Sequence, residues 1–274
     1  MKKLVAIALL MAAPIESHAW DQRPNRPINE CAKDLPFGVP IVSTPNTTLE
    51  CHEGYALQHD NSAKIPVWVG WTITPEETVG CVARTDSFAA DLILPKGQRS
   101  EVSDYVRSGY DKGHLAPDGD MSYDALVERE SFLMSNMSPQ LPSLNRGAWK
   151  QLESQTREWA LLRNHNLTVY SGNVYTLGKS KTIGENRVVV PDALYKIIID
   201  DVTGEVLAFY FPQEESKSID SSLRVTTVAE IERYTGVYFP VPAGYNKNSV
   251  TFIIWSRSPL NIIGAKRSTC KSKI

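Results

Sequence analysis

Two apolar segments separated by four residues constrain the fold of this chain more than any other feature. Residues 193–200 and 205–211 are rich in Ile, Val, Phe and Tyr, and residues 201–204 between them have the composition of a turn. Such a pair predicts a β-hairpin, and therefore antiparallel strand pairing. Residues 65–73 and 167–175 have the same β-branched and aromatic character, and we predict two further strands there.

Two helices are predicted from apolar spacing and end signals. The first covers about residues 146–163, where Trp149 and Trp159 recur near helical spacing and are expected in the core. The second begins at the capping residue Thr227 and ends at Gly236. Strands and helices do not alternate regularly along the chain. We therefore predict an α+β fold with a mainly antiparallel central sheet flanked by helices.

The N-terminus has the pattern of an export signal. Lys2 and Lys3 precede a short apolar run, and a small-x-small triplet stands before Trp20. Residues 1–19 are therefore predicted to be a signal peptide, which implies a periplasmic or extracellular protein. The remaining residues 20–274 are predicted to form a single domain that starts with an irregular arm over residues 20–50. No later apolar run is long enough to cross a bilayer, so no membrane association is expected.

Four cysteines remain after the predicted signal peptide. An oxidising compartment favours two disulfides, and four cysteines allow three pairings. We prefer Cys31–Cys51 with Cys81–Cys270, because the first pair closes a short local loop. The formal net charge is −2, which by itself does not indicate a polyanionic partner. The basic residues after Glu232 are interpreted as a solvated tail.

One histidine stands out by its surroundings. The sequence predicts a strand ending at His114, a second short strand within residues 131–140, and then a helix with Asn145 at or near its N-cap. This order can bring an imidazole and an amide together. A neutral imidazole can accept a proton from water, and an amide oxygen suits Mg²⁺. The pair is compatible with metal-assisted phosphodiester hydrolysis, although isolated histidines and helix-capping asparagines are more often structural.

Residues 109–157 resemble the DNA/RNA non-specific endonuclease family, the secreted ββα-metal (His-Me finger) nucleases. The family hallmark Asp-Arg-Gly-His corresponds to Asp111-Lys112-Gly113-His114. It is followed by Ser-Asn-Met-Ser-Pro-Gln at residues 135–140 and Leu-Asn-Arg-Gly-Ala-Trp at residues 144–149. The resemblance implies a ββα-metal motif over about residues 109–163. It extends more weakly to residues 83–88 and 170–175.

The resemblance also implies roles for the catalytic and metal-binding residues. His114 corresponds to the general base that activates water, and Arg84 to an arginine that binds the phosphate in the transition state. Asn145 corresponds to the direct protein ligand of a single Mg²⁺, for which Mn²⁺ can substitute. Glu153 corresponds to the acid that holds metal-bound water.

Four further residues correspond to substrate-binding positions. Asn136 and Gln140 match polar positions that line the cleft, and Arg157 matches an arginine of the helix that could also pair with Glu153. Lys112 replaces the hallmark arginine. Lysine keeps the positive charge but lacks the planar two-pronged geometry of arginine.

The implied function is that of a secreted, Mg²⁺-dependent, sequence-nonspecific endonuclease with DNA and RNA as substrates. Its products are expected to carry 5′-phosphate ends. The alternative is a catalytically inactive module of the same fold that binds nucleic acid or another partner. The sequence leaves the oligomeric state and the preference between DNA and RNA open.

Overall fold

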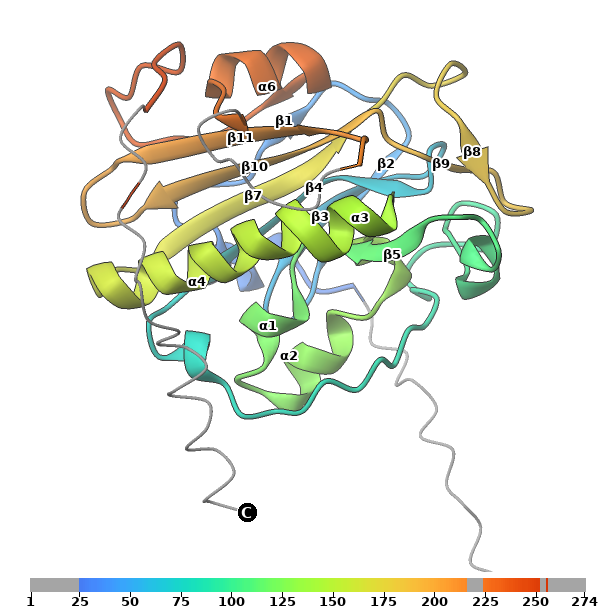
Figure 1. Ribbon diagram of the computed structural model, residues 1–274, viewed down its shortest axis with the longest axis horizontal. Helices are drawn as coiled ribbons and strands as arrows, with labels where there is room; N and C mark the ends of the chain where they lie inside the picture. Colours follow the sequence, from blue (N-terminus) through green and yellow to red (C-terminus); the bar gives the residue numbers. More distant parts are fainter. Residues whose placement is uncertain (1–24, 216–223, 252–254, 256–274) are drawn as a thin grey trace, which may run out of the picture.

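A six-stranded antiparallel sheet forms the centre of the molecule (Figure 1). The computed structural model describes residues 25–215, 224–251 and 255. In spatial order the strands are β11 (Val206–Pro212), β10 (Ala193–Asp200), β7 (Leu167–Val174), β4 (Ile65–Ile73), β3 (Ala56–Asp60) and β2 (Thr47–Cys51). The predicted α+β class with a mainly antiparallel sheet is confirmed.

The predicted hairpin is formed by β10 and β11, which pair through their whole length. Side chains alternate along β10, and both faces of the strand are buried. Leu194 and Ile198 belong to one apolar core, whereas Tyr195, Ile197 and Ile199 belong to the other. The sheet therefore separates two cores.

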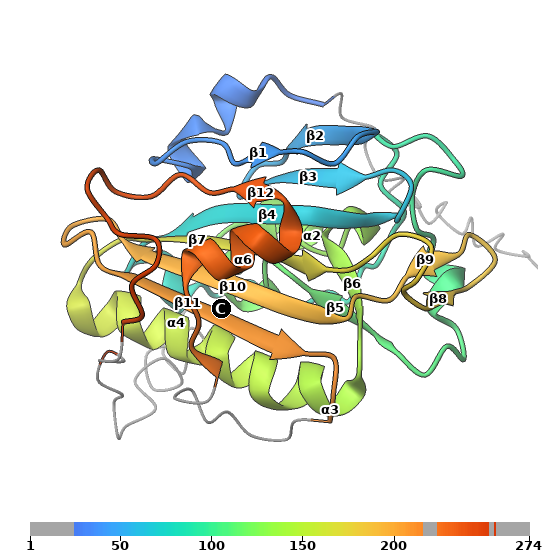
Figure 2. The same ribbon diagram turned by 90° about the horizontal axis from the view of Figure 1, so that it is seen from above.

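Helices α4 (Lys150–Arg163) and α6 (Val228–Thr235) cover opposite faces of the sheet (Figures 1 and 2). Helix α4 contributes Leu152 and Trp159 to the first core, and α6 contributes Val228 and Ile231 to the second. The expected core position of Trp149, just before α4, is also confirmed. Each core thus forms between one face of the sheet and one amphipathic helix.

The ends of α6 agree with the sequence signals. The Thr227 hydroxyl accepts a hydrogen bond from the Glu230 backbone N–H at 3.0 Å, which satisfies one of the unpaired donors at the helix start. Gly236 follows the helix with φ of 67°, a left-handed conformation that glycine adopts without steric cost.

The N-terminal arm is more regular than expected. Its last residues form β2, which pairs with β3 at the edge of the sheet, and residues 41–42 form a second short strand, so the prediction of an irregular arm is wrong for residues 41–42 and 47–50. The predicted disulfide Cys31–Cys51 is present and joins the arm to this strand. The predicted signal peptide and Cys270, the expected partner of Cys81, lie outside the described residues.

Shorter elements complete the described fold. They are β1 (Ile41–Val42) paired with β12 (Val237–Tyr238), β8 (Thr182–Ile183) paired with β9 (Val188–Val189), and the helices α1 (Asp118–Met121), α2 (Ala125–Glu130) and α3 (Pro142–Leu144). Short 3₁₀ turns occur at Ile28–Glu30, Ala32–Asp34, Glu77–Val79, Val102–Tyr105 and Met134–Asn136. Within the described part of the chain, no helix combines the length and apolar character needed to span a bilayer.

The segment with the predicted catalytic residues packs on one face of the sheet, with side chains such as Leu115 and Leu152 in the first core. Strands β4 and β7 are direct neighbours in the sheet, although a long stretch of sequence lies between them. The residues of this stretch form an additional two-stranded sheet and several helices. Within it, β5 (Asp111–His114) pairs with β6 (Met137–Gln140), and His114 lies opposite Met137. The predicted order of strand, connection, strand and helix is therefore present.

Candidate active site

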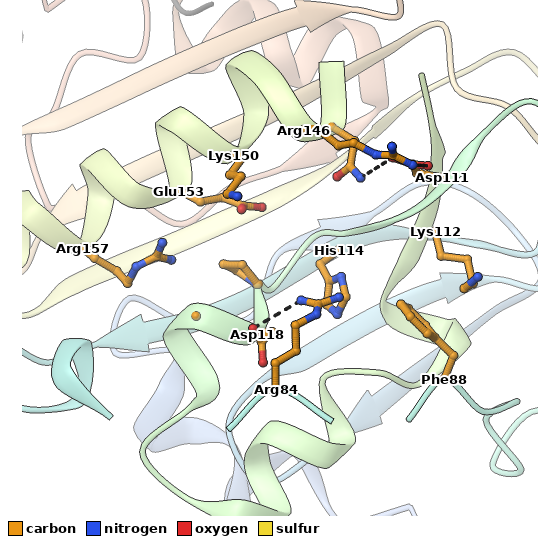
Figure 3. Close-up of a pocket in the computed structure, with 13 residues that line it drawn as sticks. Arg84, Phe88, Asp111, Lys112, His114, Asp118, Arg146, Lys150, Glu153 and Arg157 are labelled. Atoms are coloured by element: carbon orange, nitrogen blue, oxygen red, sulfur yellow. Dashed lines mark hydrogen bonds and ion pairs between the residues drawn. The ribbon is translucent and has the colours of Figure 1, made fainter. Parts of the chain in front are cut away.

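A cavity of about 660 Å³ lies between β5, the loop that follows it, and the start of α4 (Figure 3). It is lined by Arg84, Phe88, Asp111, Lys112, His114, Pro117, Asp118, Gly119, Asn145, Arg146, Lys150, Glu153 and Arg157. Five of these side chains are basic and three are acidic, so the cavity is locally cationic although the whole chain is not. A surface of this kind attracts phosphate groups.

His114 is the last residue of β5 and is held between two aromatic rings. Its ring centroid lies 5.7 Å from that of Phe88 and 4.9 Å from that of Phe132. The residue is 8% exposed, and its Nε2 atom has no hydrogen-bond partner among the described residues. Burial and the nearby Arg84 charge lower the pKa of His114 to about 3. The imidazole is therefore neutral at physiological pH and has a free nitrogen.

Asn136 holds the chain that follows His114 and does not line the cavity. Its amide nitrogen donates to the carbonyls of Ala116 and Ser131, and its amide oxygen accepts from the Ala116 backbone N–H at 2.9 Å. The side chain is fully buried. The prediction that Asn136 lines the cleft is therefore wrong, because its polar atoms are all turned toward the backbone.

Gln140 is also buried beneath β5 rather than exposed in the cavity. Its side chain packs on Gly113, where an added Cβ would come within 2.2 Å of Gln140 Cδ. Because Gly113 has no side chain, the Gln140 side chain can occupy the space next to it. The prediction that Gln140 lines the cleft is wrong for this reason.

Asn145 lies at the C-terminal end of α3 and is not the N-cap of that helix. Helix α3 starts earlier, with Pro142 in its first turn, and Asn145 has helical dihedral angles (φ −57°, ψ −50°). Its Nδ2 atom donates to Asp111 Oδ2 at 2.9 Å. Because a carboxylate only accepts, this contact fixes the amide nitrogen toward Asp111 and leaves the amide oxygen Oδ1 available to the cavity.

A kinked π-helical turn at Asn145–Trp149, in which Gly147 has non-helical dihedral angles (φ −103°, ψ −110°), allows Asn145 and Glu153 to share one cavity. Eight residues do not repeat on one face of a regular α-helix. A π turn takes up about one additional residue, so the two side chains come to the same side of the helix. Such turns are frequent at functional sites. The eight-residue offset is thus compatible with joint action.

Glu153 is a half-buried carboxylate on the cavity wall. Burial outweighs the attraction of Lys196 and Arg157 and raises its pKa to about 7. Arg157 forms its ion pair with Asp120 and not with Glu153, with which the sequence suggested it could pair. Arg157 Nη1 donates to Asp120 Oδ1 at 2.6 Å, while the guanidinium still lines the cavity.

Two predicted phosphate-binding cations stand at the cavity rim. Arg84 contacts Asp118 at 3.3 Å and Asp86 at 2.8 Å, and its guanidinium lies 4.8 Å from the Phe132 ring centroid. The Lys112 ammonium lies 4.6 Å from the Phe88 ring centroid. No described carboxylate is within ion-pair distance of Lys112, so its charge is available to a ligand.

Sequence reasoning missed several lining residues. Asp111 was part of the hallmark, but its contact with Asn145 was not foreseen, and Arg146 pairs with the same carboxylate at 2.7 Å. Lys150 lies one helical turn before Glu153 and also lines the cavity. Two of them could have been found in the sequence, because Arg146 is adjacent to Asn145 and Lys150 lies one helical turn before Glu153.

The α+β fold and the paired strands followed by a helix around one histidine are the arrangement of the ββα-metal nucleases. Residues 37–243 match the family described as DNA/RNA non-specific endonuclease. This chain therefore belongs to the DNA/RNA non-specific endonuclease family.

Individual relatives are similar over most of the chain. A nuclease of Nostoc sp. is 32% identical over 213 residues, which are 73% of this chain and 76% of that protein. Mitochondrial nuclease EXOG of Homo sapiens is 30% identical over 224 residues, which are 74% of this chain but only 59% of EXOG. A crystal structure of the EndoG/EndoGI complex superposes with a TM-score of 0.69 at 27% identity, covering 77% of this chain and 91% of that one.

Proposed function

We propose that this protein is an exported, Mg²⁺-dependent endonuclease that hydrolyses phosphodiester bonds of DNA and RNA without sequence preference. The observation that carries the proposal is the presence in one cavity of a neutral imidazole and an amide oxygen that Asp111 orients. An inactive binding module would not need either group in this state.

The proposed reaction starts with a water molecule held next to His114. An imidazole nitrogen of His114 accepts a proton from this water as the oxygen attacks phosphorus and the bond from phosphorus to the leaving oxygen breaks, so the water becomes the nucleophile without a free hydroxide. Arg84 and Lys112 bind the phosphate oxygens from the cavity rim. The Arg84 guanidinium favours the transition state, in which negative charge on the phosphate increases, whereas Lys112 contributes mainly to substrate binding.

The residues present fit a hard divalent cation. Asn145 Oδ1 would bind it directly, and Glu153 would hold it through water, because oxygen ligands and retained waters are typical of Mg²⁺. When bound, Mg²⁺ or Mn²⁺ supplies positive charge at the phosphate and the leaving oxygen. Since the pKa of Glu153 is raised to about 7, cation binding at neutral pH would favour its ionised form.

The proposed lack of sequence preference follows from the kind of contact. The basic side chains of the cavity can bind phosphates, and phosphate contacts carry little sequence information. The expected 5′-phosphate products require the leaving oxygen to be the 3′ oxygen of the neighbouring nucleotide. The disulfide Cys31–Cys51 supports the proposed export, since disulfides persist in oxidising compartments.

The test is cleavage of plasmid DNA and of RNA by the purified mature chain, with Mg²⁺ and with EDTA. We expect cleavage of both substrates, its loss in EDTA, and a decrease of at least about 100-fold in His114→Ala, because positioned general bases contribute about that much or more. His165→Ala is the matched control, since His165 contacts Asp200 and does not line the cavity. Binding of nucleic acid without cleavage would refute the enzymatic proposal, and full activity of folded His114→Ala would refute the role of His114.

A further inference from the structure

A second group of metal-ligand side chains lies away from the cavity. Glu50 is in the edge strand β2, His52 follows the end of that strand, and Asp91 is in the long connection between β4 and β5. The three residues are 0%, 4% and 2% exposed. His52 Nε2 lies 3.5 Å from Glu50 Oε2 and 3.4 Å from Asp91 Oδ2. None of them lines the His114 cavity.

The polar atoms at the centre of this group lack partners. Both carboxylate oxygens of Glu50 and the Nε2 atom of His52 have no hydrogen bond within the described residues. Their separations also exceed the about 2.7–2.9 Å of a charge-assisted hydrogen bond. Buried polar atoms left in this state are costly, and a cation between them would bind one Glu50 oxygen and the His52 nitrogen as ligands.

The distances suit a tetrahedral metal ion. Zinc bonds to imidazole nitrogen and carboxylate oxygen are about 2.0–2.1 Å long, which places neighbouring tetrahedral ligands about 3.3–3.4 Å apart. The two distances from His52 Nε2 are 3.4 and 3.5 Å, and one ligand atom from each residue lies within 4.8 Å of the others. Two carboxylates and a neutral imidazole carry a charge of −2, which a divalent cation neutralises.

The surroundings hold these side chains in place. Asp91 Oδ2 accepts from the Ser135 hydroxyl at 2.6 Å, and Asp91 Oδ1 accepts from the Ile93 backbone N–H at 3.0 Å. The His52 ring stacks on Tyr55 with the centroids 4.6 Å apart. Partners of this kind orient the ligands of protein metal sites.

We propose that Glu50, His52 and Asp91 bind one zinc-class divalent cation that stabilises the fold. The ion would join the edge strand β2 to the connection before β5, whose Asp91 also accepts a hydrogen bond from Ser135 in the turn before β6. The site is separate from the Mg²⁺ site of the proposed function, and this inference holds or fails independently of nuclease activity.

The competing occupant is a proton. Burial, followed by the charge of Asp91, raises the pKa of Glu50 to about 8. A metal-free cluster would therefore hold Glu50 as a neutral acid at neutral pH. The two states differ in metal content and in their response to replacement of Glu50 by its neutral analogue.

The first experiment measures metal content and thermal stability of the wild-type protein, purified without chelator. Elemental analysis is expected to give about one zinc ion per chain. Dialysis against dipicolinate should lower Tm by about 10 °C, and added ZnCl₂ should restore it. Asn145→Ala, which alters only the proposed Mg²⁺ ligand, should keep its zinc.

The second experiment compares Glu50→Gln with Glu130→Gln. Glu130 is a nearby buried carboxylate outside the cluster that accepts from the Glu53 backbone N–H at 2.8 Å. We expect Glu50→Gln to lose zinc and the zinc-dependent rise in Tm, and Glu130→Gln to keep both. Wild-type protein with less than about 0.1 first-row metal ion per chain and a Tm unchanged by ZnCl₂ would overturn the proposal. Those wild-type measurements decide the question even where a variant does not fold.

Discussion

Asp111 fixes the orientation of Asn145 by accepting a hydrogen bond from its amide nitrogen, and it also pairs with Arg146. At the scale of single residues, the site depends on such supporting contacts as much as on the groups proposed to react. Without Asp111, the Asn145 amide could rotate and present either its oxygen or its nitrogen to the cavity. The carboxylate therefore selects a ligand atom that the asparagine alone would not define.

Asp111→Ala should accordingly weaken metal use without removing a proposed ligand. We expect a decrease of about 10- to 100-fold in apparent Mg²⁺ affinity or in rate, the range found when partners of metal ligands are removed. Arg146→Ala is the control for the apparent Mg²⁺ affinity, because it removes a cavity cation but leaves the contact between Asp111 and Asn145 in place. Cleavage rates over a Mg²⁺ titration measure both effects, and identical titrations for Asp111→Ala and wild type would contradict the proposed orientation.

Lys112 should contribute mainly to substrate binding. Its ammonium lies over the Phe88 ring at the rim and has no carboxylate partner among the described residues, so a phosphate can approach it directly. We expect Lys112→Ala to raise KM, and Lys112→Arg to remain active because the charge is kept. Kinetics at two ionic strengths check this, since loss of a phosphate contact also reduces the salt dependence. A lower kcat with unchanged KM in Lys112→Ala would assign Lys112 to the transition state instead.

At the scale of elements, helix α3, the kinked π turn and α4 position the proposed metal ligands. The start of α3 at Pro142 and the π turn after it give Asn145 and Glu153 a common side. The fully buried Asn136 has a comparable function for the chain after β5, which it joins to the turn before β6. The helical segment and the hydrogen bonds of Asn136 together set the relative position of His114 and Asn145.

Asn136→Ala should therefore reduce stability rather than substrate affinity. The change removes three hydrogen bonds and leaves buried backbone groups of Ala116 and Ser131 without partners. Each such bond contributes about 1 kcal/mol, so we expect a loss of about 3 kcal/mol in the free energy of unfolding and a decrease of about 6–12 °C in Tm. Thermal unfolding and KM should be measured together. An unchanged Tm with a raised KM would restore Asn136 to the substrate-binding surface.

Sequence reasoning identified those elements whose signals are local. The hairpin of β10 and β11 has two apolar strands around a turn, and α6 has a capping threonine and a terminal glycine. The short strand β2 was missed because its residues, including Thr47 and Glu50, lack a clear apolar alternation and pair only through the sheet. An element can be predicted from local sequence when the sequence shows both its apolar pattern and the residues that begin and end it.

The candidate site was predictable only in part for a related reason. The motif identified His114, Asn145 and Glu153, and the structure brings all three to one cavity. It could not distinguish residues facing the cavity from those beneath it, so Asn136 and Gln140 were assigned to the wrong side. The direction of a side chain depends on tertiary packing around the strand, which sequence position does not reveal.

At the scale of the whole molecule, burial of histidines links the fold to pH. His59, in β3, is fully buried and its pKa is lowered to about 4, chiefly by desolvation. Its unfolded pKa is near 6.5, so between these values the unfolded chain binds more protons than the folded one. The resulting stability is fully present above about pH 6.5 and is lost as the pH falls toward 4.

Replacement of His59 by glutamine should reduce this acid sensitivity. We expect the free energy of unfolding of His59→Gln to change less between about pH 6.5 and pH 4 than that of wild type, because the titrating group is absent while His114 remains in both proteins. Urea unfolding at several pH values in this interval provides the comparison. Parallel pH profiles for the two proteins would show that His59 is protonated equally in both states.

Strands β4 and β7 pair directly, although the chain between them contains His114, Asn145, Glu153 and the other proposed catalytic groups. The reacting surface is thus an insert between two neighbouring strands of a frame. Substitutions in such an insert can alter substrate preference while the hydrogen-bond register of the frame is unchanged. For evolution and for protein engineering, the cavity-facing residues of this insert can change the chemistry, whereas Leu152 and Trp159 of α4, which pack on the sheet, are constrained by the architecture.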